Sequence, residues 1–349
     1  MYFNIQIYRL KLKQPVKNID LEKRVFAASG NNFTELAVEL FHFQYNNNLI
    51  YHKYCDTLNI AVSEVNSLQK IPFLPIAFFK SHQIKTTDFE AEAVFESSGT
   101  TSGINSKHFV KNLSLYKKSF LTCFEKFYGA ANNKSLLGLL PSYLERNNSS
   151  LVFMVDELIK QSADNLSGFY LYDLNKLHST ILHNEILQQP AILIGVTYAL
   201  LDFAEKYPMQ LRHTIVMETG GMKGRREEIT RQEVHRLLQN NLGLSLVHSE
   251  YGMTELLSQA YSKGDGIFHC PPWMKIVVRE EDDPFSIYPA QNIKEKPITG
   301  AINIIDLANI YSCCFIATGD VGRLYSNESF EVLGRIDNSD VRGCSLISV

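Results

Sequence analysis

The chain has 349 residues, a length that allows one large domain or two to three smaller ones. Its 34 Lys and Arg residues nearly balance its 37 Asp and Glu residues, and the net charge of −3 gives no reason to expect nucleic acid as a partner. Hydrophobic residues make up 45% of the chain and charged residues 20%, which excludes a mainly disordered polypeptide.

The spacing of the cysteines and the first residues of the chain indicate the cellular compartment. Six cysteines are spread along the chain without a CxxC pair, so their spacing predicts neither a disulfide framework nor a zinc site made of cysteines alone. The first residues lack the basic and then apolar pattern of a secretory signal. No apolar run is long enough to cross a bilayer, so no membrane span is expected. Together these features predict a reducing, cytoplasmic location.

Residues 1–90 are predicted to form a helical N-terminal region. Residues 32–41 carry apolar side chains at helical spacing behind polar residues that are able to cap a helix. The two prolines within residues 71–76 exclude a regular helix over that stretch.

Residues 91–265 alternate short apolar runs with amphipathic stretches, which indicates an α/β core with a largely parallel sheet. The strands expected there are residues 136–140, 191–194, 214–217 and 244–247. The expected helices are residues 113–127, 151–161, 196–206 and 227–240.

Residues 266–349 are predicted to form a β-rich subdomain packed on this core, because helical patterns become scarce. The strands expected there are residues 273–279, 302–305, 312–317, 321–325 and 330–333.

Residues 97–103 are seven consecutive serines, threonines and glycines, and Lys107 follows them. Glycines let the backbone approach a ligand closely, N–H groups and hydroxyls are able to surround phosphate oxygens, and a lysine adds a positive charge. The spacing of a Walker loop is absent. A flexible linker is the alternative, but the apolar run before the segment favours phosphate binding.

Residues 248–255 directly follow the predicted strand at 244–247, and functional residues of open α/β sheets gather at the carboxyl ends of strands. Tyr251 is able to stack on a base, Thr254 to donate to a phosphate and Glu255 to hold Mg²⁺. Alternatively, Thr254 and Glu255 cap the next helix of an ordinary strand-to-helix turn.

A third segment, Thr318-Gly319-Asp320, lies between predicted strands, and Gly334-Arg335-Ile336-Asp337 follows it. The Asp320 carboxylate is able to accept hydrogen bonds from a ribose diol. Taken alone, the Thr-Gly-Asp sequence favours a hairpin turn instead.

In this order, the four segments resemble the motifs of the adenylate-forming superfamily, which includes acyl-CoA ligases and the adenylation domains of peptide synthetases. The resemblance implies an N-terminal-type domain of parallel-rich sheets flanked by helices, with a β-rich subdomain and without the usual small C-terminal domain. More narrowly, residues 74–80 and 342–347 are similar to the phenylacetate–CoA ligase-like branch and to the acyl-protein synthetases of the fatty-acid reductase in bacterial luminescence.

The resemblance implies ATP-dependent activation of a fatty or aromatic carboxylic acid, with ATP and Mg²⁺ bound by the motif residues. The β- and γ-phosphates would be held by Ser97, Ser98, Gly99, Thr100, Thr101 and Lys107. The adenosine would be held by Gly220 and Gly221 against adenine, Tyr251 stacked on adenine, and Asp320 and Arg335 at the ribose. Thr254 would contact the α-phosphate, and Glu255 would bind Mg²⁺.

The resemblance also implies transfer of the activated acyl group to a thiol, for which Cys344 occupies the matching place near the C-terminus. Arg342 would favour its thiolate, although a small buried hydrophobe is the alternative role for such a cysteine. Coenzyme A or a carrier protein is an alternative acceptor, and a non-catalytic nucleotide-binding relative is a further interpretation. A reductase, an acyltransferase or a carrier protein is the candidate protein partner.

Overall fold

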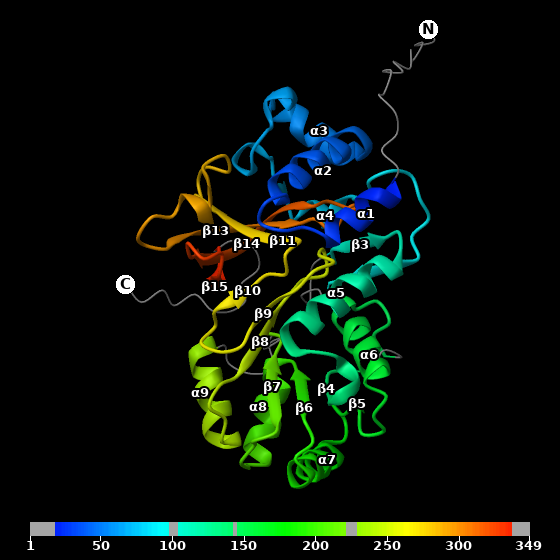
Figure 1. Cartoon of the computed structure of the whole chain (residues 1–349), viewed down its shortest axis with the longest axis vertical. Helices are drawn as coiled ribbons and strands as arrows, with labels where there is room; N and C mark the ends of the chain where they lie inside the picture. The colour runs from blue at the N-terminus through cyan, green and yellow to red at the C-terminus, as the bar shows by residue number, and fades with distance from the viewer. Residues whose placement is uncertain (1–17, 98–103, 142–144, 221–228, 337–349) are drawn as a thin grey trace.

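The structure is a computed structural model that describes residues 18–97, 104–141, 145–220 and 229–336 (Figure 1). Thirteen strands in this part of the chain form one sheet, and two more form a separate hairpin. Within the described residues, no helix combines the length and the apolar character needed to cross a membrane.

The N-terminal segment is mostly helical. Its helices are α1 (Asn18–Phe26), α2 (Phe33–Asn47), α3 (Leu49–Thr57) and α4 (Phe78–Ser81), with 3₁₀ turns at Val62–Glu64 and Leu68–Lys70. Between them the two prolines leave only the short strand β1 (Leu74–Pro75), which pairs in parallel with a strand near the C-terminus. The N-terminal segment therefore contributes to the large sheet as well as covering it.

The middle of the chain confirms the predicted alternation of strands and helices. A hairpin of β2 (Ala93–Glu96) and β3 (Lys107–Val110) comes first. The parallel strands are β4 (Ser135–Leu139), β5 (Gly168–Phe169), β6 (Ala191–Gly195), β7 (Thr214–Glu218) and β8 (His248–Tyr251). The helices are α5 (Leu113–Tyr128), α6 (Ser150–Ser162), α7 (Leu174–Leu187), α8 (Thr197–Lys206) and α9 (Arg231–Leu242), of which α7 was not predicted.

The strand predicted at residues 244–247 is wrong, because this stretch is the irregular connection between the end of α9 and β8. Gly243 adopts the left-handed conformation with φ 62°. Its N–H donates to the Gln239 carbonyl, which also accepts from the Leu244 N–H at 3.2 Å. Leu244 then packs on the core, as an apolar residue after a C-terminal glycine does. The real strand, β8, is polar in sequence and carries no apolar alternation that would mark it.

The C-terminal part consists mainly of antiparallel strands. They are β9 (Ala260–Ser262), β10 (Phe268–His269), β11 (Met274–Arg279), β12 (Ile287–Pro289), β13 (Ile298–Asp306), β14 (Phe315–Leu324) and β15 (Phe330–Arg335), with a 3₁₀ turn at Ala290–Asn292. The two strands predicted at 312–317 and 321–325 are one continuous strand, β14. The hairpin interpretation of Thr318–Asp320 is therefore wrong.

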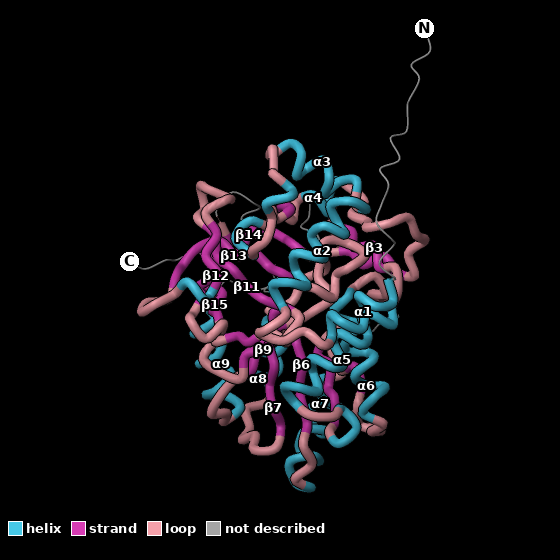
Figure 2. Tube along the Cα trace, turned by 45° about the horizontal axis from the view of Figure 1, so that its top comes forward, coloured by secondary structure: helices cyan, strands magenta, loops and turns pink. Residues whose placement is uncertain are grey.

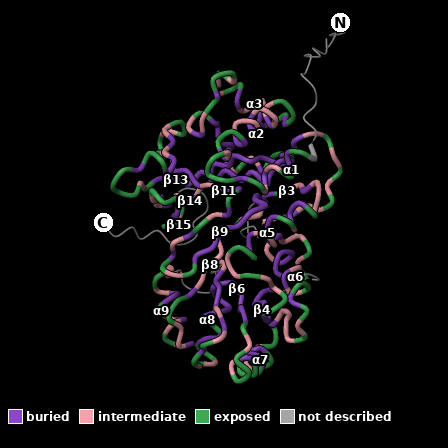
Figure 3. Tube along the Cα trace, viewed as in Figure 1, coloured by how far each residue is buried: buried purple, intermediate pink, exposed green. Residues whose placement is uncertain are grey.

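The sheet runs in the order β12-β11-β13-β14-β15-β10-β9-β8-β7-β6-β4-β5, so antiparallel strands fill one half and parallel strands the other. Figure 1 places the parallel strands and α5–α9 in the lower half, and the N-terminal helices beside the antiparallel strands in the upper half. Figure 2 shows the strands running through the middle with helices around them, and Figure 3 shows that they form the buried centre. Helices α5 and α9 lie on opposite faces of β8, because α5 contacts His248 whereas α9 contacts Ser249.

Helix α2 is joined to the C-terminal strands by the fully buried Gln44. Its amide group donates to the carbonyls of Asn309 and Ile310 at 3.1 and 3.0 Å, and its oxygen accepts from the Cys314 N–H at 2.9 Å. Three backbone groups of the turn at residues 309–314 therefore depend on one side chain.

We expect Gln44→Ala to lower the free energy of unfolding by about 3 kcal/mol, because it leaves buried backbone groups without partners. Urea denaturation of the purified variant measures this loss. Asn46→Ala on the same helix is the matched control, since Asn46 is exposed and donates only to the His42 carbonyl. Its effect should stay within about 0.5 kcal/mol, and equal losses in the two variants would contradict the assignment.

Candidate active site

The candidate active site lies where β8 ends and meets β14 and β15. Parallel pairing sets Glu218 of β7 level with Ser249 of β8, so the carboxyl ends of these strands reach the same edge of the sheet. The Tyr251 hydroxyl donates to Asp320 Oδ2 at 2.7 Å, and Arg335 Nε donates to Asp320 Oδ1 at 3.0 Å. Three residues that separate sequence motifs singled out therefore meet at one carboxylate.

Tyr251 is buried, with its ring centroid 5.9 Å from that of Phe268 and 5.6 Å from that of Phe330. Burial, followed by the charge of Asp320, raises the pKa of the Tyr251 hydroxyl well above its usual value, so the hydroxyl keeps its proton and donates. The same negative charge raises the pKa of the Arg335 guanidinium. Asp320 is thus a buried acceptor between two stable donors.

The segment after β8 is a turn followed by the antiparallel strand β9, so the helix-cap interpretation of Thr254 and Glu255 is wrong. The fully buried Asn309 amide donates to the Glu255 carbonyl at 2.8 Å. Asp306, also fully buried, accepts from the N–H groups of residues 257 and 258 at 2.8 and 3.0 Å. These side chains fix the turn that presents Glu255.

His108 of β3 holds the same turn from the other side. Its Nδ1 lies 2.8 Å from the Thr254 carbonyl oxygen, and its Nε2 lies 3.1 Å from Asn309 Oδ1. Burial lowers the pKa of His108 to about 4, so at neutral pH the ring has one proton and donates to one of these oxygens at a time. His108 joins the β2–β3 hairpin to the turn.

Glu255 places a buried carboxylate among the turn, the hairpin and the two C-terminal strands. Burial raises the pKa of this carboxyl, while a hydrogen bond from Ser106 and the charge of Arg335 act in the opposite direction. Mg²⁺ is commonly bound by one or two carboxylates together with substrate phosphates, so the oxygen chemistry of Glu255 fits this ion. In the described part of the chain, no group of three or more His, Cys, Asp or Glu side chains could hold a metal by itself.

The β2–β3 hairpin carries the predicted phosphate loop at its tip. The Ser97 N–H donates to the Ser106 carbonyl at 3.1 Å, and the Ser106 N–H donates to Ser97 Oγ at 2.9 Å. The predicted site residues that lie outside the described part are Ser98, Gly99, Thr100, Thr101, Gly221 and Cys344. Ser106, at the base of the loop, donates a hydrogen bond to Glu255. Ser106 was not among the site residues predicted from sequence.

Lys107 lies on the other face of this hairpin. Its Nζ is 3.4 Å from Glu96 Oε1, and its side chain is exposed while the next residue, His108, is buried. In this structure Ser106 approaches Glu255, whereas the predicted phosphate contact of Lys107 remains a prediction.

Gly220 follows β7 with φ 74°, a conformation that favours glycine. Its N–H donates to Glu218 Oε2 at 2.6 Å, and its carbonyl accepts from the Thr197 N–H at 3.4 Å. Within the described residues, no heavy atom lies within 4 Å of the position where a Cβ would stand. No described atom therefore covers this side of the Gly220 backbone.

Two acidic residues that the sequence interpretation missed, Glu218 and Glu250, occupy neighbouring strand ends. Burial opposes ionisation of Glu218, but a hydrogen bond from His235 and the charge of Arg231 lower its pKa to about 2. Burial and then the Glu218 charge raise the pKa of Glu250 to about 8. Each residue had one signal in the sequence: Glu218 lies two positions before Gly220, and Glu250 directly precedes Tyr251.

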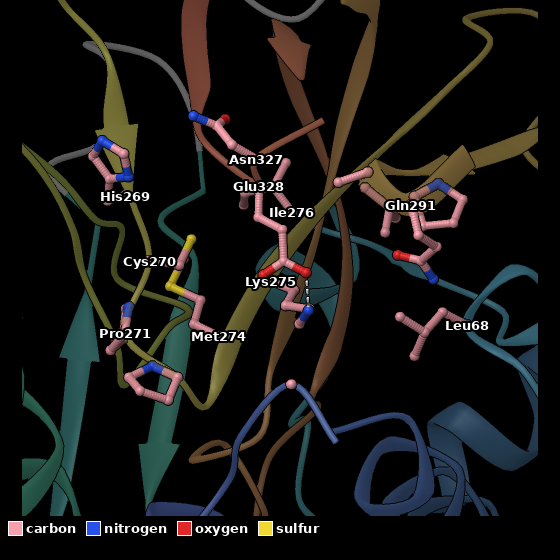
Figure 4. Close-up of a pocket in the computed structure, with 15 residues that line it drawn as sticks. Leu68, His269, Cys270, Pro271, Met274, Lys275, Ile276, Gln291, Asn327 and Glu328 are labelled. Carbon is pink, nitrogen blue, oxygen red and sulfur yellow. Dashed lines mark hydrogen bonds and ion pairs between the residues drawn. The ribbon is translucent and has the colours of Figure 1, made fainter. Parts of the chain in front are cut away.

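A separate pocket of about 190 Å³ opens between β10, β11 and the N-terminal segment (Figure 4). Cys270, Met274 and Leu68 line it, and the ion pair between Lys275 and Glu328 lies within it. None of the described site residues predicted from sequence belongs to its lining. The candidate active site is distinct from this pocket.

Comparison with known proteins finds no matching family model. Over 331 residues the chain is 24% identical to the long-chain-fatty-acid–luciferin-component ligase of Vibrio harveyi, a match that covers 88% of this chain and 84% of that protein.

Two solved structures share the fold. 2-Hydroxyisobutyryl-CoA ligase matches with a TM-score of 0.61 and 10% identity over 95% of this chain and 74% of that chain. ATP-bound MatB from Rhodopseudomonas palustris matches with a TM-score of 0.52 and 16% identity over 72% of this chain, which spans only 50% of the length of that MatB. The predicted mixed α/β fold is confirmed. The chain is therefore similar in sequence along most of its length to a fatty-acid ligase, and it shares its fold with 2-hydroxyisobutyryl-CoA ligase and MatB.

Proposed function

We propose that the protein uses ATP to activate a carboxylic acid as an acyl-adenylate. The observation that carries this proposal is the convergence of Tyr251, Asp320 and Arg335 at the end of β8, close to the buried carboxylate of Glu255. ATP-bound MatB among the structures of similar fold supports the choice of nucleotide.

The acceptor capacity of Asp320 suits a ribose. Its two oxygens offer about four lone-pair sites, and the donors Tyr251 and Arg335 use one on each oxygen. The remaining sites are able to accept from the two hydroxyls of a ribose diol. In the proposed arrangement Arg335 stays near the ribose, Tyr251 stacks on adenine, and the backbone of Gly220 and Gly221 lies against the base.

The proposed phosphate contacts come from the hairpin and the turn. Ser97, Ser98, Gly99, Thr100, Thr101 and Lys107 would hold the β- and γ-phosphates, and Thr254 would contact the α-phosphate. Mg²⁺, when bound, supplies positive charge beside the departing pyrophosphate. Glu255 would hold that ion, since its buried carboxylate is stabilised in the ionised form by a nearby cation.

The first half-reaction forms a bond between a carboxylate oxygen of the acid and the α-phosphorus of ATP. The bond from the α-phosphorus to the bridging oxygen breaks, and pyrophosphate leaves. The contribution of this chain is to hold both reactants in line and to exclude water with the buried turn at residues 254–258.

In the second half-reaction we propose that a thiol attacks the acyl carbonyl, so that a thioester forms, AMP leaves and the thiol proton passes to solvent. Cys344 is the proposed acceptor, and coenzyme A or a carrier protein is the alternative. The fatty-acid ligase of Vibrio harveyi, similar over most of this chain, favours a fatty acid as the substrate. A reductase, an acyltransferase or a carrier protein as partner, and the cytoplasm as location, stay predictions.

Acid-dependent exchange between ATP and labelled pyrophosphate tests the first half-reaction. We expect exchange with at least one member of a panel of aliphatic acids of increasing chain length and aromatic acids. Without any acid, exchange should fall to background. Nucleotide binding without exchange across the whole panel would favour the non-catalytic interpretation.

Glu255→Gln should lower the exchange rate by at least ~100-fold, because an amide keeps the shape of the side chain but loses the charge that holds Mg²⁺. Since burial raises the pKa of Glu255, the wild-type protein should also need less Mg²⁺ for half-maximal exchange as the pH rises. Glu328→Gln is the control, as Glu328 pairs with Lys275 outside the site. Wild-type exchange in Glu255→Gln would remove Glu255 from the mechanism.

Incubation with ATP and a labelled acid should give an adduct on Cys344 that hydroxylamine releases, as a thioester requires. Cys344→Ala should abolish this adduct and retain acid-dependent exchange. Cys270→Ala, which changes a free cysteine outside the site, should keep the adduct. An adduct that persists in Cys344→Ala would exclude Cys344 as acceptor, and coenzyme A or carrier protein would then be supplied in single-turnover reactions.

A further inference from the structure

The carboxylate of Glu218 connects two parts of the candidate site that lie on different strands. On one side, Oε2 accepts from the Gly220 N–H at 2.6 Å and from Thr197 Oγ1 at 3.3 Å. On the other side, Oε1 lies 3.3 Å from Arg231 Nε and 3.7 Å from His235 Nε2, both on α9. Glu218 is 4% exposed, so these contacts replace water almost completely.

Arg231 extends this connection to the far side of the site. Its Nη1 donates to the Val332 carbonyl of β15 at 2.9 Å, and its guanidinium lies 5.2 Å from the centre of the Phe268 ring. Strand β15 also carries Arg335, which binds Asp320. In the sheet order, β10, β9 and β8 separate β15 from β7, so these side chains bridge strands that do not pair with each other.

Glu218 holds the backbone of Gly220, and no described atom covers one side of that backbone. The Gly220 N–H donates to Glu218, and the Gly220 carbonyl accepts from the Thr197 N–H. The N–H of the preceding residue, Thr219, donates to the Gly195 carbonyl at 3.0 Å. The position beside the Gly220 Cα is empty of described atoms to 4 Å. A backbone that hydrogen bonds hold in place, and that no described atom covers on one side, is suited to contact a flat group with little loss of entropy on binding.

We propose that Glu218 is a positioning residue for the nucleotide base: it sets the Gly220 backbone against adenine and keeps that backbone in register with the ribose-binding residues of β14 and β15. This inference rests on the proposed ATP-dependent function. It assigns to Glu218 no contact with the nucleotide and no role at the phosphates.

Ionised Glu218 is suited to this position because it presents acceptors in both directions. Arg231 and His235 keep the carboxyl ionised despite its burial, with a pKa of about 2. Gln at this position offers one acceptor oxygen and one donor nitrogen, while the Gly220 N–H and the Arg231 guanidinium are both donors. Glu218→Gln therefore leaves one of the two connections unmade without changing the size of the side chain.

The test measures dissociation constants of Glu218→Gln and of the wild-type protein by titration calorimetry in the presence of Mg²⁺. The two ligands are ATP and inorganic tripolyphosphate, which has the phosphates but no base. We expect the dissociation constant of ATP to rise about 10-fold and that of tripolyphosphate to change less than about 2-fold. General damage to the fold would weaken both ligands in proportion. A proportional change, or no change in either ligand, overturns the inference.

Glu185→Gln is the matched control, because Glu185 of α7 contacts the start of β7, at the opposite end of that strand from Glu218. Glu185 accepts from the N–H groups of Arg212 and His213 and from Thr214 Oγ1, so it also supports β7, but away from the site. It should leave the ratio of the two dissociation constants at the wild-type value. A ratio that shifts as far as in Glu218→Gln would overturn the inference.

Arg231→Gln gives a second measurement if Glu218→Gln does not fold, because it breaks the connection from the α9 side. The same selective loss of ATP affinity is expected, and a proportional loss overturns the inference. If the wild-type protein binds no ATP, the proposed function fails and the inference fails with it. If the wild-type protein binds ATP and the variants keep the wild-type ratio, the inference alone fails.

Discussion

The carboxylate of Asp320 is shared between two donors that arrive from different parts of the chain. Tyr251 ends β8 in the parallel half of the sheet, and Arg335 ends β15 in the antiparallel half. Because a buried carboxylate that loses a donor keeps an uncompensated charge, the positions of the two strands depend on each other. Among the described residues, one side chain donates to each oxygen of this carboxylate, and the proposed ribose contact rests on the acceptor capacity that remains.

The turn that presents Glu255 is supported from a distance by a series of buried amides. Gln44 of α2 holds the turn at residues 309–314, and Asn309 within that turn holds the Glu255 carbonyl. His108 adds the β2–β3 hairpin to the same group. Since each amide satisfies backbone groups that have no access to water, the N-terminal helices help to define the geometry of a site that they do not enter.

Three glutamates near the end of β8 illustrate how surroundings decide the charge of one residue type. Glu218 has cationic partners and stays ionised, with a pKa of about 2. No ion pair joins Glu250 to a cation in the described part of the chain, and burial, followed by the charge of Glu218, raises the pKa of Glu250 to about 8. Burial raises the pKa of Glu255, and a hydrogen bond from Ser106 and the charge of Arg335 offset part of that rise. A carboxylate that stays ionised, such as Glu218, is suited to hold backbone groups in place. A carboxylate whose pKa is raised by burial, such as Glu255, is stabilised in its ionised form when a cation binds, which suits the proposed role in ion binding.

The sequence alone indicated the resemblance to the adenylate-forming superfamily and the alternation of strands and helices, because short motifs and hydrophobic periodicity are local properties. It also indicated Tyr251, Asp320 and Arg335, but not that one carboxylate joins them. Two local patterns were misleading. Gly243 ends α9 and leaves Leu244 in the connection after the helix instead of in a strand, and pairing with β13 and β15 extends β14 through Thr318–Asp320 instead of a turn. The roles of Ser106, Glu218 and Asn309 depend on partners from other strands and helices, so only folding, which brings those partners within hydrogen-bonding distance, distinguishes these residues from ordinary polar side chains.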